Sequence, residues 1–128
     1  MKFRPVTKTL AQIACLWFKS VMKMEDWKIN VTLQDEPPPW VEDKCPTMVA
    51  YVNCWVASKT ADVWLSNYRC QHQGEEKPCD PLESLIHEFL HCALRDVEIK
   101  AETDAVEGLL WRLERILGFA FRRGLTSE

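Results

Sequence analysis

Two histidines and a glutamate, His87, Glu88 and His91, form the pattern H-E-x-x-H in the second half of the chain. Residues four apart on a helix lie one turn above each other, so both imidazoles can reach the same metal ion. Glu88 then projects beside them, where its carboxylate can take a proton from a metal-bound water. The chain has only three histidines, and two of them belong to this pattern. The spacing therefore predicts a metal site that activates water.

The stretch that carries these residues has the signals of a helix that begins at Pro81. Asp80 is a good N-cap, proline fits the first helical position, and Glu83 stands three residues after the cap, as in a capping box. Apolar residues then recur at helical spacing on one face, at Leu82, Leu85, Ile86, Phe89, Ala93 and Leu94. A helix is therefore predicted to hold His87 and His91 on one side.

Hydrophobic periodicity also predicts the elements around this helix. They are a helix over 8–23, strands over 27–32, 48–57 and 61–65, and a helix over about 98–117 that Gly118 ends. The polar stretch 69–78 is predicted to be a loop. The order of a helix, three short strands and two helices indicates an α+β fold with a small, mainly antiparallel sheet. At 128 residues the chain is expected to be a single domain, 1–128.

The composition is that of an ordinary globular domain with no sign of a nucleic-acid partner. The residues are 47% apolar and 27% charged, and the formal net charge is -3. No basic run interleaves with aromatic residues, and no glycine-rich phosphate-binding loop is present. The six tryptophans are interpreted as core residues. We therefore expect a small monomer that binds no nucleic acid.

The first residues and the cysteines bear on the cellular compartment. The apolar run 13–18 is far shorter than the roughly 20 residues of a membrane span. Lys19 and Lys23 interrupt it and no small-x-small cleavage site follows, so we interpret it as a mature helix rather than a signal peptide. We expect a cytoplasmic protein with no membrane partner and reduced cysteines. If a disulfide forms, Cys70 and Cys79 are the best pair, because a short polar loop separates them.

The order of a helix, a small sheet, an H-E-x-x-H helix and a second helix resembles that of the zincin metallopeptidases. The chain is similar to a minimal gluzincin, of the kind found in minigluzincins and in small phage-type metallopeptidases. The layout covers nearly the whole chain, and its specific part is 87–91. The resemblance implies zinc, a glutamate third ligand on the following helix, and hydrolysis of peptide bonds. It also implies that an extended peptide pairs with an edge strand, which we place from Ala61 to Ser66.

The third zinc ligand is expected beyond His91. A metzincin would have glycine at position 94 and histidine at 97, where this chain has Leu94 and Val97. No histidine follows His91, so a carboxylate or a cysteine must complete the set. The carboxylates on or beside the last predicted helix are Glu98, Glu102, Asp104 and Glu107.

The helix face on which each carboxylate lies indicates how well it could serve as the third ligand. Its buried stripe is predicted at Ala105, Val106, Leu109, Leu113 and Ile116. Glu102 falls on this stripe one turn earlier, where a carboxylate is costly unless it is paired or binds metal. Glu107 lies on the other side, with Arg115, and is expected to face water. We therefore predict Glu102 as the third ligand, with Glu98 and then Glu107 as rivals, and a salt bridge as the alternative role for Glu102.

Together with the resemblance to the gluzincins, these residues predict a zinc-dependent metallopeptidase that acts on a peptide or protein. His87, His91 and Glu102 would hold the zinc ion. Glu88 would act as general base toward water and then pass the proton to the leaving amine. The group that stabilises the carbonyl oxygen stays open, among Tyr51, Tyr68 and the arginines.

Three other interpretations also stay open. Peptide deformylases combine H-E-x-x-H with an upstream cysteine, but the residues around Cys45 do not match their E-G-C-L-S run. Cys70, His72 and Cys79 offer three ligands for a second, structural zinc site without an evident fourth. A metal-binding regulatory or interaction domain, with little or no proteolytic activity, would use the same histidines.

Overall fold

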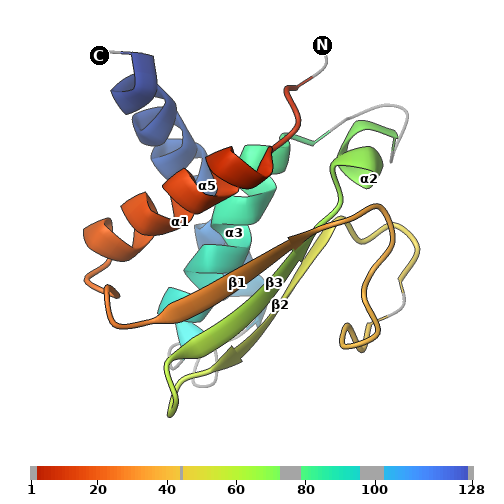
Figure 1. The fold of residues 1–128 in the computed structure, drawn as a ribbon, viewed down its shortest axis with the longest axis horizontal. Helices are drawn as coiled ribbons and strands as arrows, with labels where there is room; N and C mark the ends of the chain where they lie inside the picture. Colours follow the sequence, from red (N-terminus) through yellow and green to blue (C-terminus); the bar gives the residue numbers. More distant parts are fainter. Residues whose placement is uncertain (1–2, 44, 73–78, 96–102, 127–128) are drawn as a thin grey trace.

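The computed structural model describes residues 3–43, 45–72, 79–95 and 103–126. Its elements are α1 (Lys8–Val21), β1 (Lys28–Leu33), β2 (Ala50–Trp55), β3 (Thr60–Leu65), α2 (Asn67–His72), α3 (Pro81–Ala93) and α5 (Thr103–Thr126). The three strands form one sheet, α1 and α3 pack against it, and α5 packs against α3 (Figure 1). The predicted α+β class is confirmed.

The sheet is mixed, with the strand order β1-β3-β2. β2 and β3 form an antiparallel hairpin, but β1 pairs with β3 in parallel. The prediction of a mainly antiparallel sheet is therefore wrong for one of the two pairings, because a long connection after β1 carries the chain across to the far side of β3. The prediction of an edge strand from Ala61 to Ser66 is also wrong, because β3 has a partner on each side.

The main core lies between one face of the sheet and the helices α1 and α3. Ala61, Val63 and Leu65 are fully buried on one face of β3, because every second side chain of a strand points to the same face of the sheet. Phe18 of α1 and Phe89 of α3 meet beneath them, with ring centroids 5.4 Å apart. This packing fixes α3, and with it the H-E-x-x-H motif, against the sheet.

The opposite face of β3 is covered by the long connection between β1 and β2. Trp64 is fully buried, and its indole N–H donates to the carbonyl oxygen of Gln34 at 2.9 Å. Arg69 lies over the same indole ring, donates to the carbonyl oxygen of Met48 at 2.9 Å, and pairs with the carboxylate of Glu36 at 2.6 Å. These contacts hold the end of the connection, including Met48, in place beside β2.

α2 is a short helix that overlaps the start of the stretch 69–78, which was predicted to be a loop. Ser66 starts it as an N-cap, since its hydroxyl accepts a hydrogen bond from the Arg69 N–H at 3.0 Å. The carbonyl oxygen of Ser66 accepts from the Cys70 N–H at 3.1 Å. The prediction of a loop is therefore wrong for the part that belongs to α2, and residues 73–78 lie outside the described residues.

α5 continues to Thr126, past the glycine that was predicted to end it. Gly118 is buried against α3, and a Cβ atom added there would lie 3.2 Å from Cγ of Glu83. This glycine therefore allows two helices to approach closely instead of ending one. The predicted start of the helix near position 98 lies outside the described residues.

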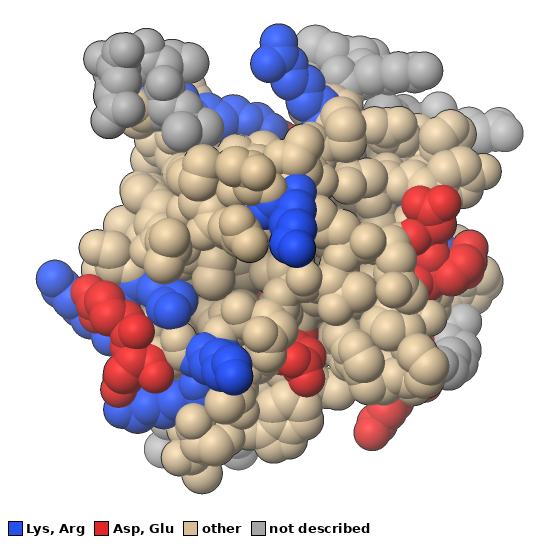
Figure 2. Space-filling model, in the orientation of Figure 1, with Lys and Arg blue, Asp and Glu red and all other residues tan. Residues whose placement is uncertain are grey.

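Several large apolar side chains lie on the surface. The face in front in Figure 2, which carries α1 and β1, is mostly uncharged, with acidic and basic side chains close together at one end. Leu16 of α1 is 66% exposed, and Trp55 and Trp111 are about half exposed, so the prediction that all six tryptophans are core residues is wrong. Among the described helices, none combines the length and the apolar character that crossing a membrane requires.

Candidate metal centre

α3 brings His87 and His91 together on the side that faces α5. Asp80 caps the helix as predicted, because its carboxylate accepts a hydrogen bond from the Leu82 N–H at 3.0 Å. The Nε2 atoms of the two histidines are 3.0 Å apart, and their rings meet edge to face with centroids 4.7 Å apart. One helical turn thus aims both imidazoles at one point, as the spacing predicts.

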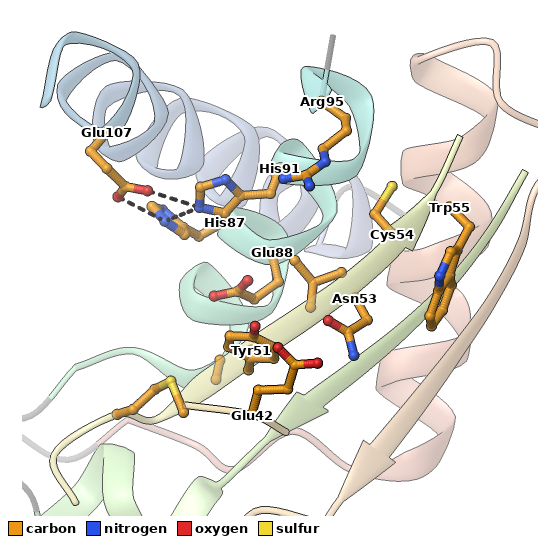
Figure 3. Close-up of a pocket in the computed structure, with 13 residues that line it drawn as sticks. Glu42, Tyr51, Asn53, Cys54, Trp55, His87, Glu88, His91, Arg95 and Glu107 are labelled. Carbon is orange, nitrogen blue, oxygen red and sulfur yellow. Dashed lines mark hydrogen bonds and ion pairs between the residues drawn. The ribbon is translucent and has the colours of Figure 1, made fainter. Parts of the chain in front are cut away.

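Glu107 of α5 supplies a carboxylate at this point. Its Oε2 atom lies 3.2 Å from Nε2 of His87, and its Oε1 atom lies 2.9 Å from Nε2 of His91 (Figure 3). One ligand atom from each of the three residues can be chosen so that all lie within 4.8 Å of one another. Among the described residues this is the group that could hold a metal ion.

The expectation that Glu107 faces water is wrong, because α5 packs on α3 through a different face from the one predicted. Leu110 and Phe121 are buried on the packed side, whereas Ile116, assigned to the buried stripe, is 63% exposed. α5 carries apolar residues outside the packed side as well, including the exposed Trp111 and Phe119, so their spacing alone did not single out the packed face. Glu102, the predicted third ligand, and its rival Glu98 lie outside the described residues.

A second carboxylate of α5, Glu114, lies behind the first histidine. Its Oε2 atom is 3.0 Å from Nδ1 of His87, although the contact is not aligned as a hydrogen bond. Burial by itself would lower the pKa of His87, but Glu114 and the nearby carboxylates of Glu88 and Glu107 raise it on balance. A carboxylate behind a metal-binding imidazole fixes its orientation and tautomer. The signal that sequence reasoning missed is the interval of seven residues, or two turns, between Glu107 and Glu114.

Glu88 points into a cleft between α3 and β2 (Figure 3). Burial raises its pKa to about 7, against the lowering effect of His91 and His87, and the carboxylates of Glu107 and Glu114 raise it further. A carboxylate with a pKa near neutrality can both accept and return a proton at neutral pH. The position of Glu88, beside the two imidazoles and open to the cleft, is the one predicted for it.

The cleft has a volume of about 750 Å³ and is walled on one side by β2. β2 is an edge strand of the sheet: it pairs with β3 on one side and with no strand of the sheet on the other. Tyr51 of β2 lies across the cleft from Glu88, and Arg95 lies at the end near His91 (Figure 3). Tyr68 is not among the residues that line the cleft, and its ring stacks on that of His72, also on α2.

Neither of the alternative cysteine sites forms among the described residues. Cys45 is exposed, and its Sγ atom lies 3.1 Å from the hydroxyl of Thr47 instead of near the histidines. His72 is also exposed, and its Nδ1 atom contacts the carbonyl oxygen of Tyr68 at 2.8 Å. The second zinc site with Cys70, His72 and Cys79 is therefore not supported.

No protein-family model, curated protein or solved structure matches this chain. The assignment of a metal centre therefore rests on its donor atoms and their geometry. Two imidazoles and a carboxylate converge from two helices that pack on each other, and a fourth polar group, Glu88, faces the adjoining cleft.

Proposed function

We propose that this chain is a zinc-dependent metallopeptidase with His87, His91 and Glu107 as the zinc ligands. Two imidazoles and one carboxylate are a common ligand set of catalytic zinc, which keeps a fourth position for water. Tetrahedral zinc with bonds of about 2.0–2.1 Å would place its ligand atoms about 3.3 Å apart. The two imidazole Nε2 atoms are 3.0 Å apart, and the two oxygens of Glu107 lie 2.9 Å from that of His91 and 3.2 Å from that of His87. With one oxygen taken as the ligand, the three donor atoms lie within 4.8 Å of one another, so small side-chain movements would accommodate the ion.

Glu88 is the residue that would move the proton. When bound, zinc supplies Lewis-acid activation of a water and of the scissile carbonyl group. Glu88 accepts the proton of that water and then gives it to the nitrogen of the leaving amine. Its neighbours on α3 hold it beside the histidines, and its raised pKa suits both halves of this transfer. Tyr51, across the cleft, is the candidate donor to the carbonyl oxygen.

The cleft supports an extended peptide as the substrate. β2 is an edge strand along its wall, and an added strand can pair with such an edge through backbone hydrogen bonds. This assignment replaces the strand from Ala61 to Ser66, which is central in the sheet. Since backbone hydrogen bonds do not depend on the side chains of the peptide, the specificity for its sequence would come from the residues that line the cleft.

The observation that carries this proposal is the convergence of His87, His91 and Glu107 beside Glu88. Zinc-loaded protein should be incubated with a mixture of unstructured synthetic peptides, and the products identified by mass spectrometry. The expected result is cleavage by the wild type and a loss of activity of about 10²–10⁴-fold in Glu88→Gln. The zinc content of Glu88→Gln should stay at the wild-type level, because Glu88 is not one of the ligands.

Three outcomes would overturn the proposal. A wild-type protein that takes up no zinc would remove the metal centre itself. A zinc-loaded wild type that cleaves no peptide would leave a metal-binding regulatory or interaction domain as the function. Cleavage that is equally fast with Glu88→Gln would assign the activity to a contaminant or to another residue.

A further inference from the structure

Two thiols lie together at the start of α3, outside the metal centre. Cys70 is on α2 and fully buried, and Cys79 directly precedes the N-cap of α3 and is partly exposed. The N–H of Cys79 donates to the carbonyl oxygen of Cys70 at 3.1 Å, and its Sγ atom lies 3.8 Å from the same oxygen. The Sγ atom of Cys70 lies 3.9 Å from the hydroxyl of Ser84. Both are free thiols in this structure.

Backbone contact of this kind suits a disulfide. Two cysteines can be bridged without backbone movement when their Cα atoms are about 4.4–6.8 Å apart. A direct N–H···O bond between Cys70 and Cys79 keeps their backbones at about this separation. The disulfide would join α2 to the N-terminus of α3 across the eight residues between the two cysteines in the sequence.

Cys79 also faces a cavity from which a small molecule can reach it. The cavity has a volume of about 360 Å³, and its wall includes Cys79, Ser84 and Trp111. It shares His87 and Glu88 with the cleft described above, so it adjoins the metal centre. The buried thiol of Cys70 is not among the residues of this wall.

The two cysteines differ in how readily they form a thiolate. Contact with the thiol of Cys70 lowers the pKa of Cys79 to about 7, and the same contact, together with burial, raises the pKa of Cys70. The thiolate is the nucleophilic form of cysteine, so Cys79 is the one that attacks and Cys70 the one that follows.

We propose that Cys79 is a thiol-modification site on the wall of the 360 Å³ cavity that adjoins the metal centre, and that Cys70 is its resolving partner. The co-reactant is a low-molecular-weight disulfide such as oxidised glutathione. The inference concerns thiols outside the metal centre, so it does not depend on the proposed peptidase activity.

The chemistry is a two-step thiol–disulfide exchange. The thiolate of Cys79 attacks one sulfur of the small disulfide, forms a mixed disulfide, and releases one small thiolate. The sulfur of Cys70 then attacks the sulfur of Cys79, gives up its proton to solvent, and releases the second small molecule as a thiolate, which takes up a proton according to the pH. The two protein thiols are oxidised by two electrons in total, and the small disulfide is reduced to two thiols.

The experiment treats the folded, full-length protein with oxidised glutathione, blocks the remaining thiols with an alkylating reagent at low pH, and maps the fragments by mass spectrometry. Trypsin cleaves after Arg69, and a glutamate-specific protease cleaves after Glu75 and Glu76. The two enzymes therefore separate Cys70 from Cys79 unless a disulfide links them. The wild type should give the linked pair of fragments, with a mass lower by two hydrogen atoms than their sum.

Variants identify the order of the steps. Cys70→Ser should keep glutathione on Cys79, because no resolving thiol is present, and Cys79→Ser should leave Cys70 reduced. Cys45 is exposed and should carry a stable glutathione adduct in every variant, which makes it the internal control for the reagent. Since Cys70 is fully buried, the wild-type experiment decides the question if Cys70→Ser does not fold.

Two results would overturn the inference. One is a wild-type protein in which Cys45 carries glutathione while Cys79 remains reduced. The other is a wild-type protein in which glutathione stays on Cys79 and no linked fragments form.

Discussion

Replacement of Glu107 by glutamine tests the metal centre most directly. The change keeps the size of the side chain and its helix propensity, but removes the charge that lies 2.9 Å from His91 and 3.2 Å from His87. Loss of a group that only supports a metal ligand weakens binding by about 10–100-fold. Loss of the charge on a ligand itself should reach at least the upper end of that range.

The expected change in thermal stability follows from linkage. At a free zinc concentration of 100 times Kd, zinc binding stabilises the folded protein by about 2.7 kcal/mol. An unfolding entropy of about 2.1 cal/mol/K per residue gives about 0.27 kcal/mol/K for 128 residues, so zinc should raise the Tm by about 10 °C. A hundredfold weaker variant at the same free zinc concentration keeps about 0.4 kcal/mol, or about 1.5 °C.

The assay is differential scanning calorimetry of the wild type, Glu107→Gln and Glu102→Gln, each with and without zinc at a buffered free concentration. Glu102→Gln is the matched control, since it changes the carboxylate that the sequence predicts as the ligand. We expect the shift of about 10 °C in the wild type and in Glu102→Gln, and its loss in Glu107→Gln. If Glu102→Gln loses the shift while Glu107→Gln keeps it, the geometric assignment of Glu107 is refuted.

Three further predictions concern the helices around the site. Glu114→Gln should weaken zinc binding by about 10–100-fold in competition with a fluorescent chelator, because the change removes the carboxylate behind a ligand, and an unchanged affinity would contradict this role. Gly108→Ala should stabilise the protein against urea by up to about 1 kcal/mol, since nothing lies within 4 Å of the new Cβ. Gly118→Leu should instead destabilise it, since its Cβ would lie 3.2 Å from the side chain of Glu83 on α3. Asp80→Ala should cost about 1–2 kcal/mol through loss of the N-cap of α3, measured by urea unfolding. Arg122→Ala should also destabilise the protein, because it leaves the carboxylate of Asp80, whose side chain is 2% exposed, without its ion-pair partner. A double-mutant cycle of the two changes separates the ion pair from the cap, and a coupling energy equal to the whole cost of Asp80→Ala would argue against the cap.

The sequence by itself determines the parts of the site that depend on local structure. His87 and His91 converge because a helix of 3.6 residues per turn places residues four apart on one side. Asp80 and Pro81 start that helix through contacts with residues that follow directly in the chain. Local signals also predict α1 and the three strands to within a few residues, because amphipathic periodicity depends on each element's own residues.

The sequence was least informative where local signals compete. Ser66 is an effective N-cap and starts α2 in a polar stretch that otherwise resembles a loop. Gly118 has the residue type that ends helices, but the close approach of α3 gives it a different role within α5. In both cases a single contact outside the periodic pattern decides the outcome.

Tertiary structure alone decides which residues meet the histidines. Glu107 and Glu114 reach His87 because α5 packs on α3 through one particular face, and apolar residues on several sides of α5 left that face ambiguous in the sequence. β2 walls the cleft because the connection after β1 crosses the sheet and leaves β3 in the centre. Both results depend on contacts between residues far apart in the chain, and the free energy of such contacts comes from the packing of whole elements, which no local pattern encodes.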